Sequence, residues 1–311
     1  MCNFWKNDLS SQDPYWLKLE EYKNFFYELK NFVNDPFLIS FGGGEPLLYA
    51  DKLLGIATIC KELSFKTHFP TNAYLIDDMM AKRIANAGIF SIGISLDSFD
   101  KDTHNFLRGK QGCWERAIEA IKLLEKNCPD ISINILTVIM GANLSGIIEL
   151  TKWVYKHSRL HGIVFQTIQR PFNADCPDNW YEFEEYANLW PSNTNKLNSV
   201  IDELIMLRQS CKDGFKICNP IAQLELFKLY FDNPRRFVKP TRCHVGDEVI
   251  RVDSFGNVMF CDEIGFMGNI KENNIHNIWY SPGAEEIRNR IYNCTKNCYH
   301  LVNCFYDGRS K

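Results

Sequence analysis

The sequence lacks the features that mark several protein classes. It has no uninterrupted run of 18 or more apolar residues, so no membrane span is predicted. Residues 1–8 do not combine a basic segment with a following apolar one, which argues against a signal peptide and favours a cytoplasmic protein. The net charge of -3 and the pI near 6.2 give no basic footprint for nucleic acid.

Disorder is also excluded over any long stretch, because 45% of the residues are hydrophobic and only 23% are charged. Cysteine, in contrast, is abundant, with 12 residues in 311. In a reducing compartment, clustered cysteines favour a metal site over disulfides. Five of the cysteines gather near the end of the chain, at Cys243, Cys261, Cys294, Cys298 and Cys304.

Short apolar runs alternate with helical patterns from residue 35 to about residue 169. This alternation predicts right-handed βα units and a parallel sheet, either an open or partial barrel or a doubly wound sheet, with ligands beyond the carboxyl ends of its strands. The expected strands are residues 37–41, 65–69, 89–96, 131–140 and 163–168. The expected helices are residues 51–63, 77–87, 115–126 and 144–157, followed by connector helices at 195–209 and 221–231.

The pattern changes near Pro240, and we expect two domains, residues 1–240 and residues 241–311. Residues 248–253 and 258–261, separated by a Gly-Asn turn, predict a β-hairpin that begins the second domain. Residues 170–192 have no clear period and are interpreted as a loop or insertion. Within it, the aromatic and acidic residues 179–183 either line a pocket or pack as an ordinary surface helix.

A glycine-rich motif follows the first expected strand directly. It consists of Gly42, Gly43, Gly44, Glu45 and Pro46. Glycines let a ligand approach the backbone closely at the end of a strand. An ordinary glycine-rich βα turn would explain the three glycines equally well, but the glutamate and the proline make the match narrower.

With its Gly-Gly-Glu-Pro segment, the chain resembles the radical S-adenosylmethionine (SAM) superfamily. In that family the motif holds the amino group of the SAM methionine. The family also carries a Cys-x3-Cys-x2-Cys loop whose thiolates hold a [4Fe–4S] cluster. Cys2, followed by Asn3 and Trp5, matches the third cysteine of that loop and lies about 40 residues before the glycines. Alone, Cys2 would be an unremarkable thiol.

Further matches follow in the order of the family's strands. Thr71-Asn72 resembles its Thr-Asn-Gly, with Ala73 in place of the glycine. The segment that contains Ser95 and Asp97 resembles a motif whose polar residues lie near SAM. Asn134 stands where the family often contacts the SAM ribose or carboxylate. The resemblance therefore implies that Asn72, Ser95, Asp97 and Asn134 help to bind SAM.

The C-terminal cysteines resemble the twitch or SPASM extension, which carries auxiliary iron–sulfur clusters. The five cysteines suit one [4Fe–4S] site rather than two, and the spacing leaves open which of Cys294, Cys298 and Cys304 is spare. A structural zinc site is the alternative, because thiolates bind both metals.

The resemblance implies an α/β fold, a partial (β/α)6 TIM-like barrel, with a small C-terminal hairpin and cysteine-rich domain. It also implies reductive cleavage of SAM to a 5′-deoxyadenosyl radical and an electron donor such as flavodoxin or ferredoxin. The substrate would be a small molecule, a cofactor precursor or a peptide. Because the first barrel strand and two cluster cysteines would precede Met1, we expect five parallel strands and no activity from residues 1–311 alone. A non-catalytic iron–sulfur or zinc-binding α/β protein is the alternative.

Overall fold

The computed structural model describes residues 15–33, 37–170, 179–186, 189–234, 243, 245–294 and 302–303. Its centre is a five-stranded sheet in the order β1-β2-β3-β4-β5, in which every neighbouring pair is parallel. The strands are β1 Leu38–Ser40, β2 Lys66–Thr71, β3 Ser91–Ser95, β4 Ser132–Ile139 and β5 Leu160–Thr167. The strands follow one another in sequence order without a reversal, which confirms the partial barrel and excludes the doubly wound alternative.

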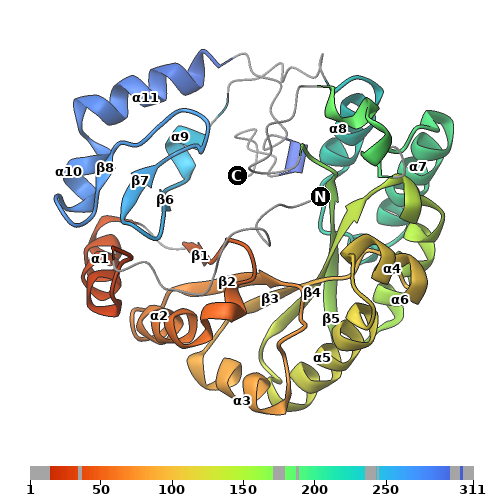
Figure 1. Cartoon of the computed structure of the whole chain (residues 1–311), viewed down its shortest axis with the longest axis horizontal. Helices are drawn as coiled ribbons and strands as arrows, with labels where there is room; N and C mark the ends of the chain where they lie inside the picture. The colour runs from red at the N-terminus through yellow and green to blue at the C-terminus, as the bar shows by residue number, and fades with distance from the viewer. Residues whose placement is uncertain are drawn as a thin grey trace.

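Helices cover the convex side of the curved sheet, while the concave side faces the middle of the molecule (Figure 1). These helices are α2 Ala50–Glu62, α3 Asp78–Ala87, α4 Lys101–Arg108, α5 Cys113–Asn127 and α6 Ile147–Lys156, with short 3-10 turns η2 Pro46–Tyr49 and η3 Gly141–Gly146. Asp77 begins α3 by accepting a hydrogen bond from the Met80 N–H, and left-handed Gly88 ends it. No helix in the described ranges is both long and apolar enough to cross a membrane.

The two faces of the sheet differ in chemistry. The side chains that face the helices are apolar and buried, as Ile92 and Ile94 show on β3. The alternate residues face the concave side and include Leu136 and Val138 of β4, but several of them are small or polar, namely His68 on β2, Ser91, Gly93 and Ser95 on β3, and Ser132 and Asn134 on β4. In the interior of a packed barrel these positions are dominated by bulky aliphatic residues. The concave side of this sheet therefore offers hydrogen-bonding groups.

The connector helices lie next to β5. They are α7 Thr194–Ser210 and α8 Ile221–Asp232, joined through the turn η6 Gly214–Lys216. After that turn, Ile217 forms a parallel bridge to Ile163 of β5, and the Cys218 N–H donates to the Ile163 carbonyl at 2.9 Å. A short backbone segment thus takes the place beside β5 that a further strand would take.

A smaller antiparallel sheet lies across the molecule from β5 (Figure 1). It contains β6 Arg251–Val252, β7 Asn257–Met259 and β8 Gly268–Asn269, and is flanked by α9 Val245–Glu248, α10 Ile275–Trp279 and α11 Pro282–Tyr292. The predicted hairpin is β6–β7, whose turn is ordered by the Asp253 carboxylate. Strand β8 was not predicted. The expected boundary near Pro240 lies outside the described residues and stays a prediction.

Helix α1, Leu19–Phe32, was also not predicted, and it joins the two sheets. Its Phe25, Phe26 and Leu29 enter one buried cluster with Ile56 of α2 and Ile278 of α10. Ahead of the helix, the Leu17 N–H donates to the Ser254 carbonyl of the hairpin turn at 2.7 Å. The barrel and the small sheet are therefore packed on one shared core.

Residues 179–183 contain the short turn η4 Trp180–Glu182, which is followed by η5 Glu184–Tyr186, and Trp180 is buried. The Trp180 ring meets Trp190 edge to face at 5.8 Å, and Trp190 in turn contacts Phe231 of α8. Trp180 and Tyr181 thus extend the main core, whereas Phe183 is exposed.

Candidate functional site

The glycine loop between β1 and α2 presents exposed backbone at the carboxyl edge of the sheet. Gly42, Gly43 and Gly44 are all exposed, and no atom lies within 4 Å of a side chain built on Gly42 or Gly43. Gly43 has φ +130°, a conformation that favours glycine. The loop therefore leaves space for a ligand against its main chain.

Glu45, the residue after these glycines, is fixed by three hydrogen bonds. Its Oε1 accepts from the Thr71 hydroxyl at 2.7 Å and from the Leu47 N–H at 3.2 Å. Its Oε2 accepts from the Asn72 N–H at 2.8 Å. A carboxylate offers about four lone-pair positions, so Oε2 keeps capacity for one more donor. This arrangement suits an ammonium group at the ends of β1 and β2.

The Thr71-Asn72-Ala73 turn is what holds Glu45 in place. The Asn72 side-chain oxygen accepts from the Tyr74 N–H at 2.9 Å, and the Thr71 hydroxyl oxygen accepts from the Ala73 N–H at 3.0 Å. Ala73 is buried with φ +62°, in the left-handed region. That conformation gives the physical reason for a glycine at this position of the motif. Thr71 itself was not among the predicted site residues, although it adjoins the predicted Asn72.

Asp97 lies in a loop after β3 and has a fully buried side chain. Its Oδ1 accepts from the Val138 N–H at 3.0 Å, and its Oδ2 pairs with Arg108 at 2.8 Å. Its main chain is held as well, since its N–H donates to His104 Nδ1 at 3.1 Å and its carbonyl accepts from Asn143 at 2.6 Å. The carboxylate is therefore engaged within the protein. It orders the ends of β3 and β4, and its predicted role in SAM binding stays a prediction.

His104 of α4 supports the same loop and is 1% exposed. Burial lowers the pKa of His104 to about 3, and the nearby positive charge of Arg108 acts in the same direction. The ring is therefore neutral in the folded protein near pH 7, and its Nδ1 accepts the Asp97 N–H as the hydrogen bond requires.

Ser95 and Asn134 lie on the concave side at different depths. Ser95 is the last residue of β3 and pairs in register with Leu136. Asn134 lies deeper, in register with Gly93 and Gly162, and its amide nitrogen is 3.3 Å from the Ser132 hydroxyl. The two side chains thus mark different levels of one polar surface.

His68 and Ser91 belong to this surface and were not predicted. His68 Nδ1 lies 2.8 Å from the Ser91 hydroxyl, and burial lowers the pKa of the imidazole. The signal available in the sequence was the alternation of polar with apolar residues along β2 and β3.

The C-terminal cysteines are described in part. Cys243 and Cys261 pack beside one buried cluster of the small domain, and burial raises the pKa of the Cys261 thiol, with the nearby Cys243 acting in the same direction. Cys294 is exposed after α11. Cys2, Cys298 and Cys304 lie outside the described residues. Within the described ranges, no three His, Cys, Asp or Glu side chains form a metal-binding group.

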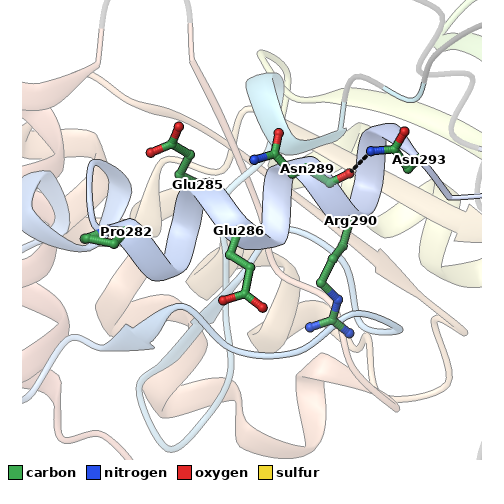
Figure 2. Close-up of a pocket in the computed structure, with 6 residues that line it drawn as sticks. All are labelled: Pro282, Glu285, Glu286, Asn289, Arg290 and Asn293. Carbon is green, nitrogen blue, oxygen red and sulfur yellow. Dashed lines mark hydrogen bonds between the residues drawn. The ribbon is translucent and has the colours of Figure 1, made fainter.

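A hollow lies along α11, away from the five-stranded sheet. Its lining residues are Pro282, Glu285, Glu286, Asn289 and Arg290 of that helix and its C-cap residue Asn293 (Figure 2). These side chains leave the helix in several directions and do not converge. None of them is a predicted site residue, so we treat the hollow as a feature of the surface and not as part of the candidate site.

Two family models match the chain. The Radical SAM superfamily model covers residues 1–154, and the SPASM model, an iron–sulfur cluster-binding domain, covers residues 243–304. The chain belongs to the radical SAM superfamily. It is a radical SAM enzyme with a SPASM domain, and its cofactors are SAM and [4Fe–4S] clusters.

Named relatives of this radical SAM enzyme include a heme synthase and an Fe-coproporphyrin III synthase. It is 25% identical over 268 residues to the AdoMet-dependent heme synthase of Methanosarcina barkeri strain Fusaro, covering 85% of this chain and 73% of that protein. It is 31% identical over 119 residues to the Fe-coproporphyrin III synthase of the same organism, which covers 38% of this chain but only 28% of that protein.

The fold of the radical SAM enzyme is also found among solved structures. Native anSMEcpe with bound AdoMet superimposes with a TM-score of 0.65 and 20% identity, over 97% of this chain and 84% of that one. At this identity the likeness shows the fold alone. It confirms the predicted TIM-like barrel with a small C-terminal domain.

Proposed function

We propose that this protein cleaves SAM reductively and abstracts a hydrogen atom from a substrate held at the concave side of the barrel. The observation that carries the proposal is the Glu45 carboxylate, held by Thr71 and Asn72 beside exposed glycine backbone. When bound, the cluster and SAM supply the 5′-deoxyadenosyl radical. The chain supplies binding, orientation and exclusion of water.

The site residues have distinct tasks in this proposal. Glu45 accepts a hydrogen bond from the SAM ammonium, and the backbone of Gly42–Gly44 lies against the methionine part. Asn72 orients Glu45 through its N–H and leaves its own side chain at the exposed surface. Ser95 and Asn134 offer hydrogen bonds to the ribose or the carboxylate. Asp97 does not contact SAM in this proposal but holds the loop after β3 in place.

The metal ligands remain proposals for the same site. Cys2 would hold the catalytic cluster together with two further thiolates. Cys243 and Cys261, which the fold already brings to one buried cluster, would begin the auxiliary site, and Cys294, Cys298 and Cys304 would complete it. Two adjacent thiols fit this role, since thiolate is the ligand of iron–sulfur clusters and of structural zinc.

For the substrate we propose a small cofactor precursor. Support comes from the heme synthase relative, whose similarity extends over most of this chain. The concave surface supports a substrate with hydrogen-bonding groups, because His68, Ser91 and Ser132 line it below Ser95. A peptide substrate is the other possibility within the family. The cytoplasmic location and the electron donor stay predictions of the sequence.

The test measures 5′-deoxyadenosine after anaerobic reconstitution with iron, sulfide, dithionite and SAM. Cys2 is the single cysteine in residues 1–59, so the assay compares this chain with a version extended upstream by Cys-x3-Cys-x, in which Met1 completes the two-residue spacing before Cys2. We expect the extended version to form 5′-deoxyadenosine and residues 1–311 alone to form none. Equal activity of the two versions would contradict the role given to Cys2. Fe-coproporphyrin III, an iron porphyrin named in one of the relatives, is the first substrate to add.

The same assay separates the non-catalytic alternative. A protein that only carries a C-terminal iron–sulfur or zinc site would bind metal but would neither bind SAM nor form 5′-deoxyadenosine in the extended version. Metal analysis and the visible spectrum then distinguish the two metals, since zinc–thiolate sites lack the broad absorption of iron–sulfur clusters.

A further inference from the structure

The free edge of β5 is closed by side-chain amides instead of by a strand. Along a strand edge, alternate residues present their N–H and C=O groups outward. At Ile163 these groups meet the backbone of Ile217 and Cys218. Two residues further on, Asn219 accepts from the Phe165 N–H at 2.7 Å and donates to the Phe165 carbonyl at 2.9 Å.

The next outward residue, Thr167, is bound by Asn303 in the same way. Asn303 Oδ1 accepts from the Thr167 N–H at 2.8 Å and from its hydroxyl at 3.1 Å, while Asn303 Nδ2 donates to the Thr167 carbonyl at 3.3 Å. Asn303 is separated from Thr167 by 136 positions in the sequence. One carboxamide therefore replaces the hydrogen bonds of an absent strand at the last residue of β5.

The backbone of residues 302–303 is itself held by the Gln223 side chain of α8. Gln223 Nε2 donates to the Val302 carbonyl at 2.7 Å and to the Asn303 carbonyl at 3.1 Å, and Gln223 Oε1 accepts from Asn219 at 2.9 Å. Gln223 is 4% exposed, Asn219 is 2% exposed and Val302 is completely buried in the main core. In Figure 1 the short violet segment of residues 302–303 lies beside α8 and the end of β5.

Asn303 immediately precedes Cys304, and Val302 and Asn303 both lie between Cys298 and Cys304. We propose that Asn303 is a positioning residue that ties the C-terminal metal site to the end of β5, at the edge of the sheet where Glu45 and Asn72 lie. Metal binding by the cysteines and ordering of the β5 edge are then coupled. The inference rests on the proposed C-terminal metal site, whether the metal is in an iron–sulfur cluster or is zinc.

The coupling has a thermodynamic consequence. A metal held by Cys304 restrains the adjacent Asn303, which protects the Thr167 and Phe165 N–H groups from exchange with solvent. By linkage, removing the Asn303 side chain lowers the metal affinity by the same factor by which the metal protects the strand.

The experiment measures deuterium uptake of a peptide spanning β5, Leu160–Thr167, in the whole chain with and without the C-terminal metal. Metal content is determined on the same samples. We expect metal loading to slow exchange at Phe165 and Thr167 by about tenfold, within the usual range for coupled sites. In N303A we expect no such slowing, and about tenfold weaker metal binding. N289A, which changes an exposed asparagine of α11, should behave like the unsubstituted chain.

N303D refines the assignment, because its carboxylate still accepts from the Thr167 N–H and hydroxyl but cannot donate to the carbonyl. We expect it to keep part of the coupling. Exchange in β5 that metal loading leaves unchanged in the unsubstituted chain would overturn the proposal, as would full coupling in N303A. A chain that retains no metal at these cysteines overturns this inference alone, since formation of 5′-deoxyadenosine is measured separately.

Discussion

At the scale of single residues, the candidate site depends on carboxylates with opposite surroundings. Glu45 is half-buried beside exposed glycine backbone and keeps hydrogen-bonding capacity, whereas Asp97 is fully buried and engaged on both oxygens. The sequence assigned both to SAM binding because both match family motifs. Motif position assigned the same role to both residues, whereas the structure shows that their surroundings differ.

Replacing Glu45 by glutamine should weaken SAM binding. The amide would present N–H groups to the Thr71 hydroxyl and the Leu47 N–H, or to the Asn72 N–H, and it loses the charge that attracts an ammonium. Hydrogen bonds to charged groups contribute about 1.5–3 kcal/mol, so we expect about 10- to 100-fold weaker binding. Calorimetric titration of the reconstituted protein with SAM measures this. The exposed Glu149, changed to glutamine, is the control, and an unaltered affinity in E45Q would remove Glu45 from the site.

His104 should make the folded protein sensitive to mild acid. Its pKa is lowered to about 3 in the folded state, against an ordinary value of 6.5. The unfolded chain therefore binds an extra proton between these pH values. The contribution of His104 to the free energy of unfolding is complete above about pH 6.5 and is lost as the pH falls toward 3. From pH 7 to pH 5 this amounts to about 2 kcal/mol.

An H104N variant tests the direction of this pH dependence, because an asparagine side-chain oxygen can still accept a hydrogen bond from the Asp97 N–H but does not titrate. The free energy of unfolding, measured in urea at pH 7 and pH 5, should fall by about 2 kcal/mol less in H104N than in the unsubstituted chain. Equal losses in both proteins would mean that His104 is not the group responsible.

At the scale of secondary structure, the sequence predicted those elements whose burial repeats with a regular period. Strand β3 and helix α3 carry buried isoleucines and alanines at the spacing expected for each. Helix α4 was missed because its buried face includes the polar His104, which supports the Asp97 loop, and the polar Asn105, which accepts from the Trp114 N–H at the start of α5. Its ends were nevertheless marked, by Asp100 as N-cap and by the left-handed Gly109.

Helix α1 was not predicted for a different reason. Its Phe32 contacts Trp279 edge to face at 5.7 Å, and Glu28 accepts a hydrogen bond from the Ile275 N–H. Both partners lie almost 250 positions further along the chain, so no local pattern announces this packing. The contact between Asn303 and Thr167 likewise joins distant segments and has no local sequence pattern. The cysteine spacing predicts a metal site, whereas the contacts of Asn303 join distant segments and cannot be predicted from that spacing.

At the scale of the whole molecule, the shared cluster around α1 should make the barrel and the small sheet unfold together. Ile278 of α10 is 3% exposed in that cluster, beside residues of α1 and α2. I278A should cost about 2–5 kcal/mol. Because α1 and α2 lose packing as well, we expect faster hydrogen exchange in both of these helices and not only in α10.

Ile287 of α11 is the matched control for I278A, because it is 6% exposed and packs in a separate cluster within the small domain. I287A should be destabilising to a similar extent, since it leaves the same kind of cavity. Its faster exchange should be confined to α9, α11 and the hairpin, with α1 and α2 unchanged. Hydrogen exchange measured peptide by peptide on both variants decides whether the barrel and the small sheet unfold together. If I278A leaves α1 and α2 as protected as I287A does, the two sheets are stabilised independently, and α1 does not join them energetically.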